Sequence, residues 1–203
     1  MKKKDILIGL VTGFLTAFVW VPVLIILNAL PWLGGKVWYL LVVVPMLFII
    51  GLALANWISR WLKLVRYLAK FLIIGFLNTG IDFAIFNFLI FRTGIEVGRE
   101  IALFKAVSFV IAVINSFFWN KYWSFEAGGS DRQGTEFAKY FFITLIGAFL
   151  NIGVTWGIVN LMPVVGGFSQ LAWDNIAAVA ATIVSLIWNF AGYRFFVFRK
   201  NRI

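Results

Sequence analysis

The chain has 203 residues, of which 63% are hydrophobic and 13% charged, and its mean hydropathy is +0.97. A soluble domain averages about 45–50% apolar and about 25% charged residues, so this composition excludes a water-soluble globule. The formal net charge is +10, and the chain has neither Cys nor His, which excludes disulfides, thiolate and imidazole metal ligands, and His-based catalysis.

Six apolar runs follow one another along the chain, over 6–29, 37–59, 71–91, 103–119, 140–161 and 171–193. Each is long enough to cross a hydrocarbon core of about 30 Å. The runs lack the alternation of barrel strands, and a lipid-facing backbone must satisfy its own hydrogen bonds, which favours helices. The first run follows three lysines but is too long for a signal peptide, so we expect a retained anchor. The predicted fold class is all-α, a polytopic membrane protein with six transmembrane helices.

Positive residues gather at alternate ends of these runs. Fourteen of the 18 lie on one side, namely Lys2, Lys3, Lys4, Arg60, Lys63, Arg66, Lys70, Lys121, Arg132, Lys139, Arg194, Arg199, Lys200 and Arg202. The other side holds Lys36, Arg92, Arg99 and Lys105. The positive-inside rule therefore predicts a multi-pass protein of the cytoplasmic membrane with both termini in the cytoplasm.

The last four predicted helices show an internal repeat. A shift of 69 residues aligns 69–71 with 138–140 and places Asp82 on Asn151. A shift of 73 residues aligns 121–125 with 194–198, each a base followed by aromatics, and places Ser116 on Asn189. We therefore expect a four-helix core made of a repeated helical hairpin, with halves of about 69–126 and 138–199, plus two extra N-terminal helices. The predicted domains are an N-terminal transmembrane hairpin over 1–66 and a four-helix transmembrane domain over 67–203.

Three stretches of this core carry a family resemblance. They are Gly-Phe-Leu-Asn-Thr at 75–79 with Asp82, Asn115 with Asn-Lys-Tyr-Trp-Ser-Phe at 120–125, and the tail 189–198. Through them the segment from about Phe71 to Arg199 resembles the GtrA-like family of small membrane proteins. The resemblance implies four membrane helices, genes that lie near those of polysaccharide glycosyltransferases, and movement of polyprenyl-phosphate-linked sugars across the cytoplasmic membrane. The two N-terminal helices depart from this four-helix pattern.

Each helix of the core carries one stripe of polar residues. The members of a stripe share a helix face because positions three or four apart lie on the same side of a helix. The stripes are Asn78 with Asp82, Ser108 one heptad from Asn115, Asn151 with Thr155, and Thr182 with Ser185 and Asn189. We expect a polar cleft for a sugar, lined by Asn78, Asp82, Asn115, Asn151 and Asn189. The alternative is that these stripes hold helices together, at about 0.6 kcal/mol per hydrogen bond.

Asp82 is the costliest of these residues, because a charge deep in a bilayer costs at least about 2.5–3.5 kcal/mol. It therefore needs an aqueous cavity, a partner or a proton, and Lys105 on the next helix is the candidate ion-pair partner.

Two basic residues are candidates for contact with a lipid headgroup. Lys121 and Arg194 sit at equivalent helix ends, each followed by aromatics, and are candidates to bind the phosphate of a lipid headgroup. The alternative is that they only set the topology.

Gly9 with Gly13, and Gly153 with Gly157, are small-residue pairs that predict close helix packing within or between subunits.

The leading hypothesis is a flippase that translocates a polyprenyl-phosphate-linked sugar across the cytoplasmic membrane for cell-surface polysaccharide or glycan synthesis, with membrane lipid as its surroundings. One alternative is a membrane anchor or scaffold for a polyprenyl-phosphate glycosyltransferase. Another is a small-molecule or ion transporter of the four-helix drug-exporter kind. For each of these functions, the protein could act as a homo-oligomer, and the sequence leaves its oligomeric state open.

An enzyme is not expected. The chain has no GxGxxG, P-loop, CxxC or HExxH pattern, so we assign no catalytic residue, cofactor or metal. The largest loop is far below the size of a nucleic-acid-binding module, so no nucleic-acid partner is expected.

The charge asymmetry makes a topological prediction. Reporter fusions should place both termini in the cytoplasm and find six crossings, because 14 of the 18 positive residues lie on that side. An external C-terminus, or five or seven crossings, would remove the basis for both the repeat and the cleft.

Overall fold

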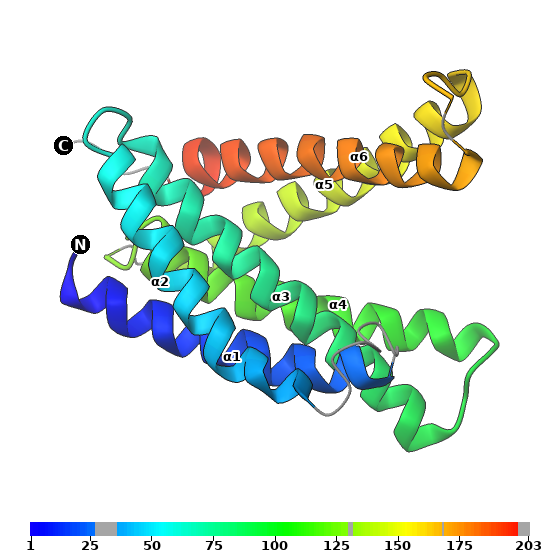
Figure 1. Ribbon diagram of the computed structural model, residues 1–203, viewed down its shortest axis with the longest axis horizontal. Helices are drawn as coiled ribbons and strands as arrows, with labels where there is room; N and C mark the ends of the chain where they lie inside the picture. The colour runs from blue at the N-terminus through cyan, green and yellow to red at the C-terminus, as the bar shows by residue number, and fades with distance from the viewer. Residues whose placement is uncertain (27–35, 130–131, 168, 199–203) are drawn as a thin grey trace. The chain divides into compact units, whose positions relative to one another are not determined.

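The computed structural model describes residues 1–26, 36–129, 132–167 and 169–198 (Figure 1). The described helices are α1 (Lys3–Ile26), α2 (Leu40–Ile58), α3 (Leu64–Thr93), α4 (Arg99–Trp119), α5 (Gln133–Leu161) and α6 (Gln170–Gly192), with short π-helices η2 (Asn120–Ser124) and η3 (Tyr193–Val197). In these ranges, six helices are long and apolar enough to cross a membrane, which confirms the predicted all-α fold. The basic residues at 199, 200 and 202 lie outside the described residues.

The chain forms two compact units, Met1–Glu126 and Ala127–Ile203. In the first, α1 packs on α2 and α3, and α3 also packs on α2, α4 and η2. In the second, α5 packs on α6 and η3. The division predicted from the repeat, 1–66 and 67–203, stays a prediction. Within the first unit, however, the two N-terminal helices pack directly on the first hairpin of the repeat.

The offsets of the sequence repeat recur in the helix bounds. α3 begins at Leu64 and α5 at Gln133, which is the 69-residue offset, and the two helices have 30 and 29 residues. η2 begins at Asn120 and η3 at Tyr193, which is the 73-residue offset, and each has five residues. Each π-helix is followed by the same bond, from Phe125 N to Asn120 O (2.9 Å) and from Phe198 N to Tyr193 O (2.8 Å). The repeated motif of a base followed by aromatics is thus a repeated π turn.

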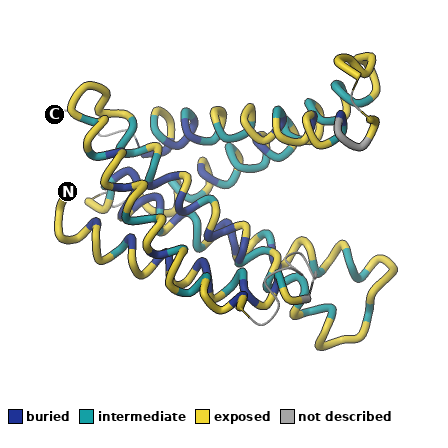
Figure 2. Tube along the Cα trace, viewed as in Figure 1, coloured by how far each residue is buried: buried dark blue, intermediate teal, exposed yellow. Residues whose placement is uncertain are grey.

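Large apolar side chains face outward, as expected of helices that lie in lipid. Phe14, Phe18, Leu47 and Phe149 are all exposed, and Figure 2 shows exposed residues along the outer faces of the helices. Buried positions include polar residues such as Thr12, whose hydroxyl donates to the Ile8 carbonyl oxygen at 2.8 Å, together with Thr16, Asn78 and Ser108. Lipid tails are as apolar as Leu, so burying apolar area between such helices gains little, and close packing and hydrogen bonds must hold them together.

Glycines provide the closest approaches in the first unit. A Cβ added at Gly9 would lie 2.7 Å from Leu52 Cδ1, and one added at Gly13 would lie 2.5 Å from Pro45 Cα. This confirms that the Gly9–Gly13 pair packs closely, in this case against α2. The pair Gly153 and Gly157 behaves differently, because no atom of the described residues lies within 4 Å of a Cβ added at either position.

α1 also packs against α3 through Trp20. The Trp20 indole Nε1 donates to the Phe76 carbonyl oxygen at 3.1 Å, and its ring stacks on the Phe76 ring with centroids 5.2 Å apart. The space for this indole is opened by Gly80, where an added Cβ would lie 2.6 Å from Trp20 Nε1. Trp20 therefore ties the N-terminal pair to the helix that carries Asn78 and Asp82.

Gly13 allows a direct test of this packing. We expect Gly13→Ala to lower the free energy of unfolding by about 1–3 kcal/mol, because its methyl group would meet the α2 backbone. Gly51→Ala is the matched control, since a Cβ at Gly51 has no neighbour within 4 Å in the described part of the chain and Ala is the better helix former. Thermal unfolding in detergent measures both. Equal midpoints for the two variants would contradict the close α1–α2 packing.

Candidate functional site

The facing polar stripes of α3 and α4 meet in two layers, the first of which is a pair of amides. Asn115 Nδ2 donates to Asn78 Oδ1 at 2.8 Å, and Asn78 Nδ2 donates to the Ile74 carbonyl oxygen of its own helix at 2.7 Å. Asn78 is buried. The helical spacing of the polar residues had placed both amides on candidate site faces, and the structure brings them together.

The second layer, one turn along α3, is charged. Asp82 forms an ion pair with Lys105, and Ser108 Oγ donates to Asp82 Oδ1 at 2.6 Å. The Asp82 side chain is 18% exposed and that of Lys105 is 49% exposed. The Lys105 ammonium also lies over the Phe83 and Phe86 rings, 5.4 and 5.7 Å from their centroids, which adds cation–π attraction.

These two layers form what we call the polar ladder, defined as Asn78, Asp82, Lys105, Ser108 and Asn115. It offers amide, hydroxyl, carboxylate and ammonium groups inside two predominantly apolar helices. The carboxylate has a cation and a hydroxyl donor, which meets the need that its burial creates. The same groups are the donors and acceptors that sugar hydroxyls use.

The remaining predicted cleft residues lie in the second unit. Asn151 is half-buried on α5, and Asn189 is half-buried on α6. The Asn189 side chain fills the space beside Gly147, the residue that corresponds to Asn78 at the 69-residue offset. Asn189 Oδ1 is buried and accepts no hydrogen bond from the described part of the chain. The two halves of the repeat therefore differ at this level, with an amide pair in one and an amide over a glycine in the other.

Lys121 and Arg194 occupy equivalent second positions of the two π-helices. The Lys121 side chain is buried, and its ammonium lies 5.9 Å from the Phe117 ring centroid and 5.8 Å from that of Tyr122. Arg194 is half-buried. Both residues follow the last turn of an apolar helix, where a basic residue can reach a headgroup or simply set the topology.

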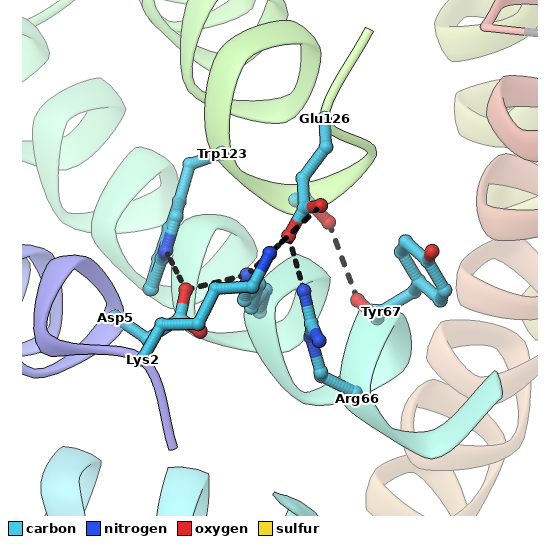
Figure 3. Close-up of polar contacts among 8 residues, drawn as sticks. Lys2, Asp5, Arg66, Tyr67, Trp123 and Glu126 are labelled. Carbon is cyan, nitrogen blue, oxygen red and sulfur yellow. Dashed lines mark hydrogen bonds and ion pairs between the residues drawn. The ribbon is translucent and has the colours of Figure 1, made fainter. Parts of the chain in front are cut away.

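Sequence analysis missed a second charged cluster, which lies where α1 and α3 begin. We call it the charged clasp and define it as Lys2, Asp5, Arg66, Lys70 and Glu126 (Figure 3). Lys70 Nζ lies 2.6 Å from Asp5 Oδ1 and 3.1 Å from Glu126 Oε1, and Arg66 pairs with the same Glu126 oxygen. Lys2 Nζ lies 3.7 Å from Glu126 Oε2. The clasp therefore joins α1, α3 and the residues just after η2.

Neutral groups complete the clasp. Trp123 Nε1 donates to Asp5 Oδ1 at 3.1 Å, and the Lys70 ammonium lies 5.6 Å from the Trp123 ring centroid. Ser124 Oγ donates to the Tyr67 carbonyl oxygen at 3.2 Å. The Lys70 side chain is only 1% exposed, so its charge is balanced inside the protein by Asp5 and Glu126.

Glu126 is held ionised by its partners. Burial raises the pKa of its carboxyl, but hydrogen bonds from Lys70 and Arg66, together with their positive charges, outweigh burial and lower the pKa from 4.5 to about 2. Its backbone φ of 53° lies in the left-handed region, which costs a non-glycine residue conformational energy. The ion pairs thus hold Glu126 in a backbone conformation that it would otherwise avoid.

One signal in the sequence points to the clasp. The chain has only 8 acidic residues, and Asp5 follows three lysines while Glu126 follows the repeated motif at 121–125. Acidic residues so placed need cationic partners, but sequence alone does not show that α1 packs on α3. No group of three or more His, Cys, Asp or Glu residues that could hold a metal ion occurs in the described ranges.

Comparison with known proteins places the polar ladder inside one family. The model of the GtrA/DPMS transmembrane domain matches residues 70–198. The chain belongs to this family. It is also 30% identical over 134 residues to the uncharacterized membrane protein YngA of Bacillus subtilis (strain 168), a match that covers 66% of this chain and 80% of YngA. No solved structure matches.

The family match covers the polar ladder but not the N-terminal helix α1. The polar ladder and both π-helices fall within 70–198, and Lys70 is the first matched residue. Asp5 and Trp20, which attach α1 to α3, fall outside the matched residues. The GtrA-like membrane domain of this multi-pass protein is therefore contacted at two levels by a helix from outside the family match.

The lowered pKa of Glu126 predicts how stability depends on pH. Because the folded pKa of about 2 lies below the ordinary value of 4.5, Glu126 stabilises the fold fully above about pH 4.5, and this contribution is lost as the pH falls toward 2. We expect Glu126→Gln to cost about 1.5–3 kcal/mol at pH 7 and less as the pH falls, as measured by unfolding in detergent. The exposed Glu96→Gln is the control. A pH-independent difference between wild type and Glu126→Gln would refute the assignment.

Proposed function

We propose that the protein translocates a polyprenyl-phosphate-linked sugar across the cytoplasmic membrane for cell-surface polysaccharide or glycan synthesis. The observation that carries the proposal is the charged layer of the polar ladder, in which Asp82, Lys105 and Ser108 meet within two membrane spans. Groups this costly to place in lipid mark substrate and ion pathways in membrane proteins. Membership in the GtrA/DPMS family supports a lipid-linked sugar as the substrate.

The groups of the polar ladder lie at successive depths along α3 and α4. By the rise of 1.5 Å per residue, Asp82 lies about 17 Å along α3 from Thr93, and Lys105 lies about 9 Å along α4 from Arg99. The amide pair of Asn78 and Asn115 follows about 6 Å further along α3. A sugar that enters from the cytoplasmic side and moves toward the α3–α4 loop would therefore meet the two amides first, then Asp82, and then the half-exposed Lys105.

The chemistry of the ladder suits a sugar in transit. A hydroxyl can donate to the Asp82 carboxylate and can accept from Lys105, Ser108 or an Asn amide. Each such bond replaces one that the ladder already makes within the protein, so the polar groups keep partners before and after the sugar arrives. The lipid tail would stay in the bilayer while the headgroup moves along the ladder.

The other predicted residues complete the proposal. Asn151 and Asn189 would offer amides from the second half of the repeat, and the buried Asn189 Oδ1 has an acceptor to spare among the described residues. Lys121 and Arg194 would meet the phosphate at the cytoplasmic surface. Membrane lipid is the solvent for the tail, and a glycosyltransferase that supplies the lipid-linked sugar is the expected neighbour.

The Asp82 carboxylate tests the proposal. In vesicles with the reconstituted protein, Asp82→Asn should lower headgroup translocation by about tenfold or more, because a charge-assisted hydrogen bond to the sugar is lost. Its melting temperature should stay near that of wild type, because the half-exposed Lys105 can reach the interface. Asn87→Leu is the control, since the Asn87 amide bonds to the Phe83 carbonyl oxygen of its own helix.

A purely structural ladder would behave in the opposite way. Asp82→Asn would then keep full translocation but lose about 3–5 kcal/mol of stability, which Lys105→Met in the same chain would restore. Normal translocation by a stable Asp82→Asn protein would therefore reject the proposed role. Wild-type vesicles without any translocation would instead favour the membrane anchor for a glycosyltransferase.

A further inference from the structure

We infer that the charged clasp is a phosphate-binding site for the lipid carrier, and that Asp5 is a built-in competitor that occupies it. The site consists of Arg66 and Lys70 on α3 with Trp123 of η2. The inference rests on the proposed function, because it takes the carrier to be a lipid phosphate. It assigns both a second anion site, apart from Lys121 and Arg194, and a task for the N-terminal helix.

The first argument is the convergence of donors on one oxygen. Asp5 Oδ1 receives Lys70 Nζ at 2.6 Å and Trp123 Nε1 at 3.1 Å, and these donors come from α3 and η2 (Figure 3). Both lie outside the helix that supplies the carboxylate. A phosphate oxygen accepts from the same cationic and neutral N–H donors. Asp5 therefore occupies a position to which an anion from outside the chain could bind.

The second argument is the charge balance of the clasp. Lys2, Arg66 and Lys70 face the carboxylates of Asp5 and Glu126, so three cations meet two anions and one positive charge remains. Departure of the first turn of α1, with both Asp5 and Lys2, would leave Arg66 and Lys70 facing Glu126 alone, so one positive charge remains for an anionic phosphate to neutralise. In addition, Arg66 Nε is buried and donates no hydrogen bond within the described residues, so the site holds a spare donor.

The third argument is the origin of Asp5. It lies in the first turn of α1, where the helix is held by the Asp5 N–H donating to the Lys2 carbonyl oxygen at 2.9 Å. First turns open more readily than helix interiors. Lys2, Lys3 and Lys4 are exposed beside Asp5, and lysines next to a span are attracted to anionic headgroups. A membrane rich in anionic lipid would therefore draw Asp5 away and open the site.

Binding of undecaprenyl phosphate to the full chain in detergent, measured with radiolabelled lipid, tests this inference. Asp5→Asn should bind about tenfold more tightly than wild type, since it removes the competing charge and keeps the shape. Arg66→Met with Lys70→Met should bind at least about tenfold more weakly. Lys63→Met is the control for charge at the same helix end, because Lys63 is exposed and lies outside the clasp. It should bind as wild type does.

A second variant tests the charge of the site without changing Asp5. Glu126→Gln removes the other carboxylate of the clasp and should also tighten binding, while Asp5→Glu keeps the charge and should not. Melting temperatures are recorded for each protein. If Asp5→Asn and Glu126→Gln both lose stability and neither gains affinity, the clasp is structural and the inference is wrong. If only Lys121→Glu with Arg194→Glu abolishes binding, the phosphate binds at those residues and the inference is also wrong.

Two further measurements are needed. Competition by inorganic phosphate distinguishes a lipid phosphate from a free anion, and a translocation assay distinguishes the binding site from the proposed transport. Inorganic phosphate that competes as well as the lipid would mark a free-anion site and overturn the assignment to a lipid carrier. Tighter binding by Asp5→Asn in a protein that translocates nothing would uphold the site and reject the proposed transport. Translocation that is intact while Asp5→Asn binds as wild type would reject the site alone.

Discussion

Polar groups inside lipid must find their partners within the protein, and this constraint shapes both units of the chain. Lipid tails cover apolar side chains about as favourably as a neighbouring helix does. Contacts between helices therefore depend on close approach and on hydrogen bonds. In the first unit, Gly13 allows α1 to approach α2, and the Trp20 indole bonds to an α3 carbonyl oxygen. The charged groups Asp82 and Lys70 each form an ion pair with a residue of another helix.

The sequence predicted those features that depend on a single helix or on the cost of burial. Six spans followed from apolar length, and a partner for Asp82 followed from the energy of a charge in lipid. The clasp could not be found in this way. Asp5 and Lys70 are far apart in the chain, and only the packing of α1 on α3 brings them together. Likewise, the aromatic motif at 121–125 showed a repeat, but the extra residue of its π turn appears only in the backbone.

The N-terminal pair changes what the family domain presents to its surroundings. Asp5 meets Lys70 near the beginning of α3, and Trp20 covers Phe76 and Gly80 further along the same helix. Both contacts lie on the helix that also carries Asn78 and Asp82 toward α4. α3 thus packs on both α1 and α4, so the helix that carries Asn78 and Asp82 is held from two directions.

The π-helix at the end of α4 has a consequence for the orientation of that segment. A π turn holds an additional residue, so the side chains beyond it are rotated by about 100° from where a continuous α-helix would direct them. In η2 this rotation buries Lys121, Trp123 and Ser124 together, and Trp123 reaches α1. The turn acts as a one-residue phase shift between the lipid-facing pattern of α4 and the inward-facing pattern of η2. Deleting a single residue there would keep the segment helical but would point its indole away from α1.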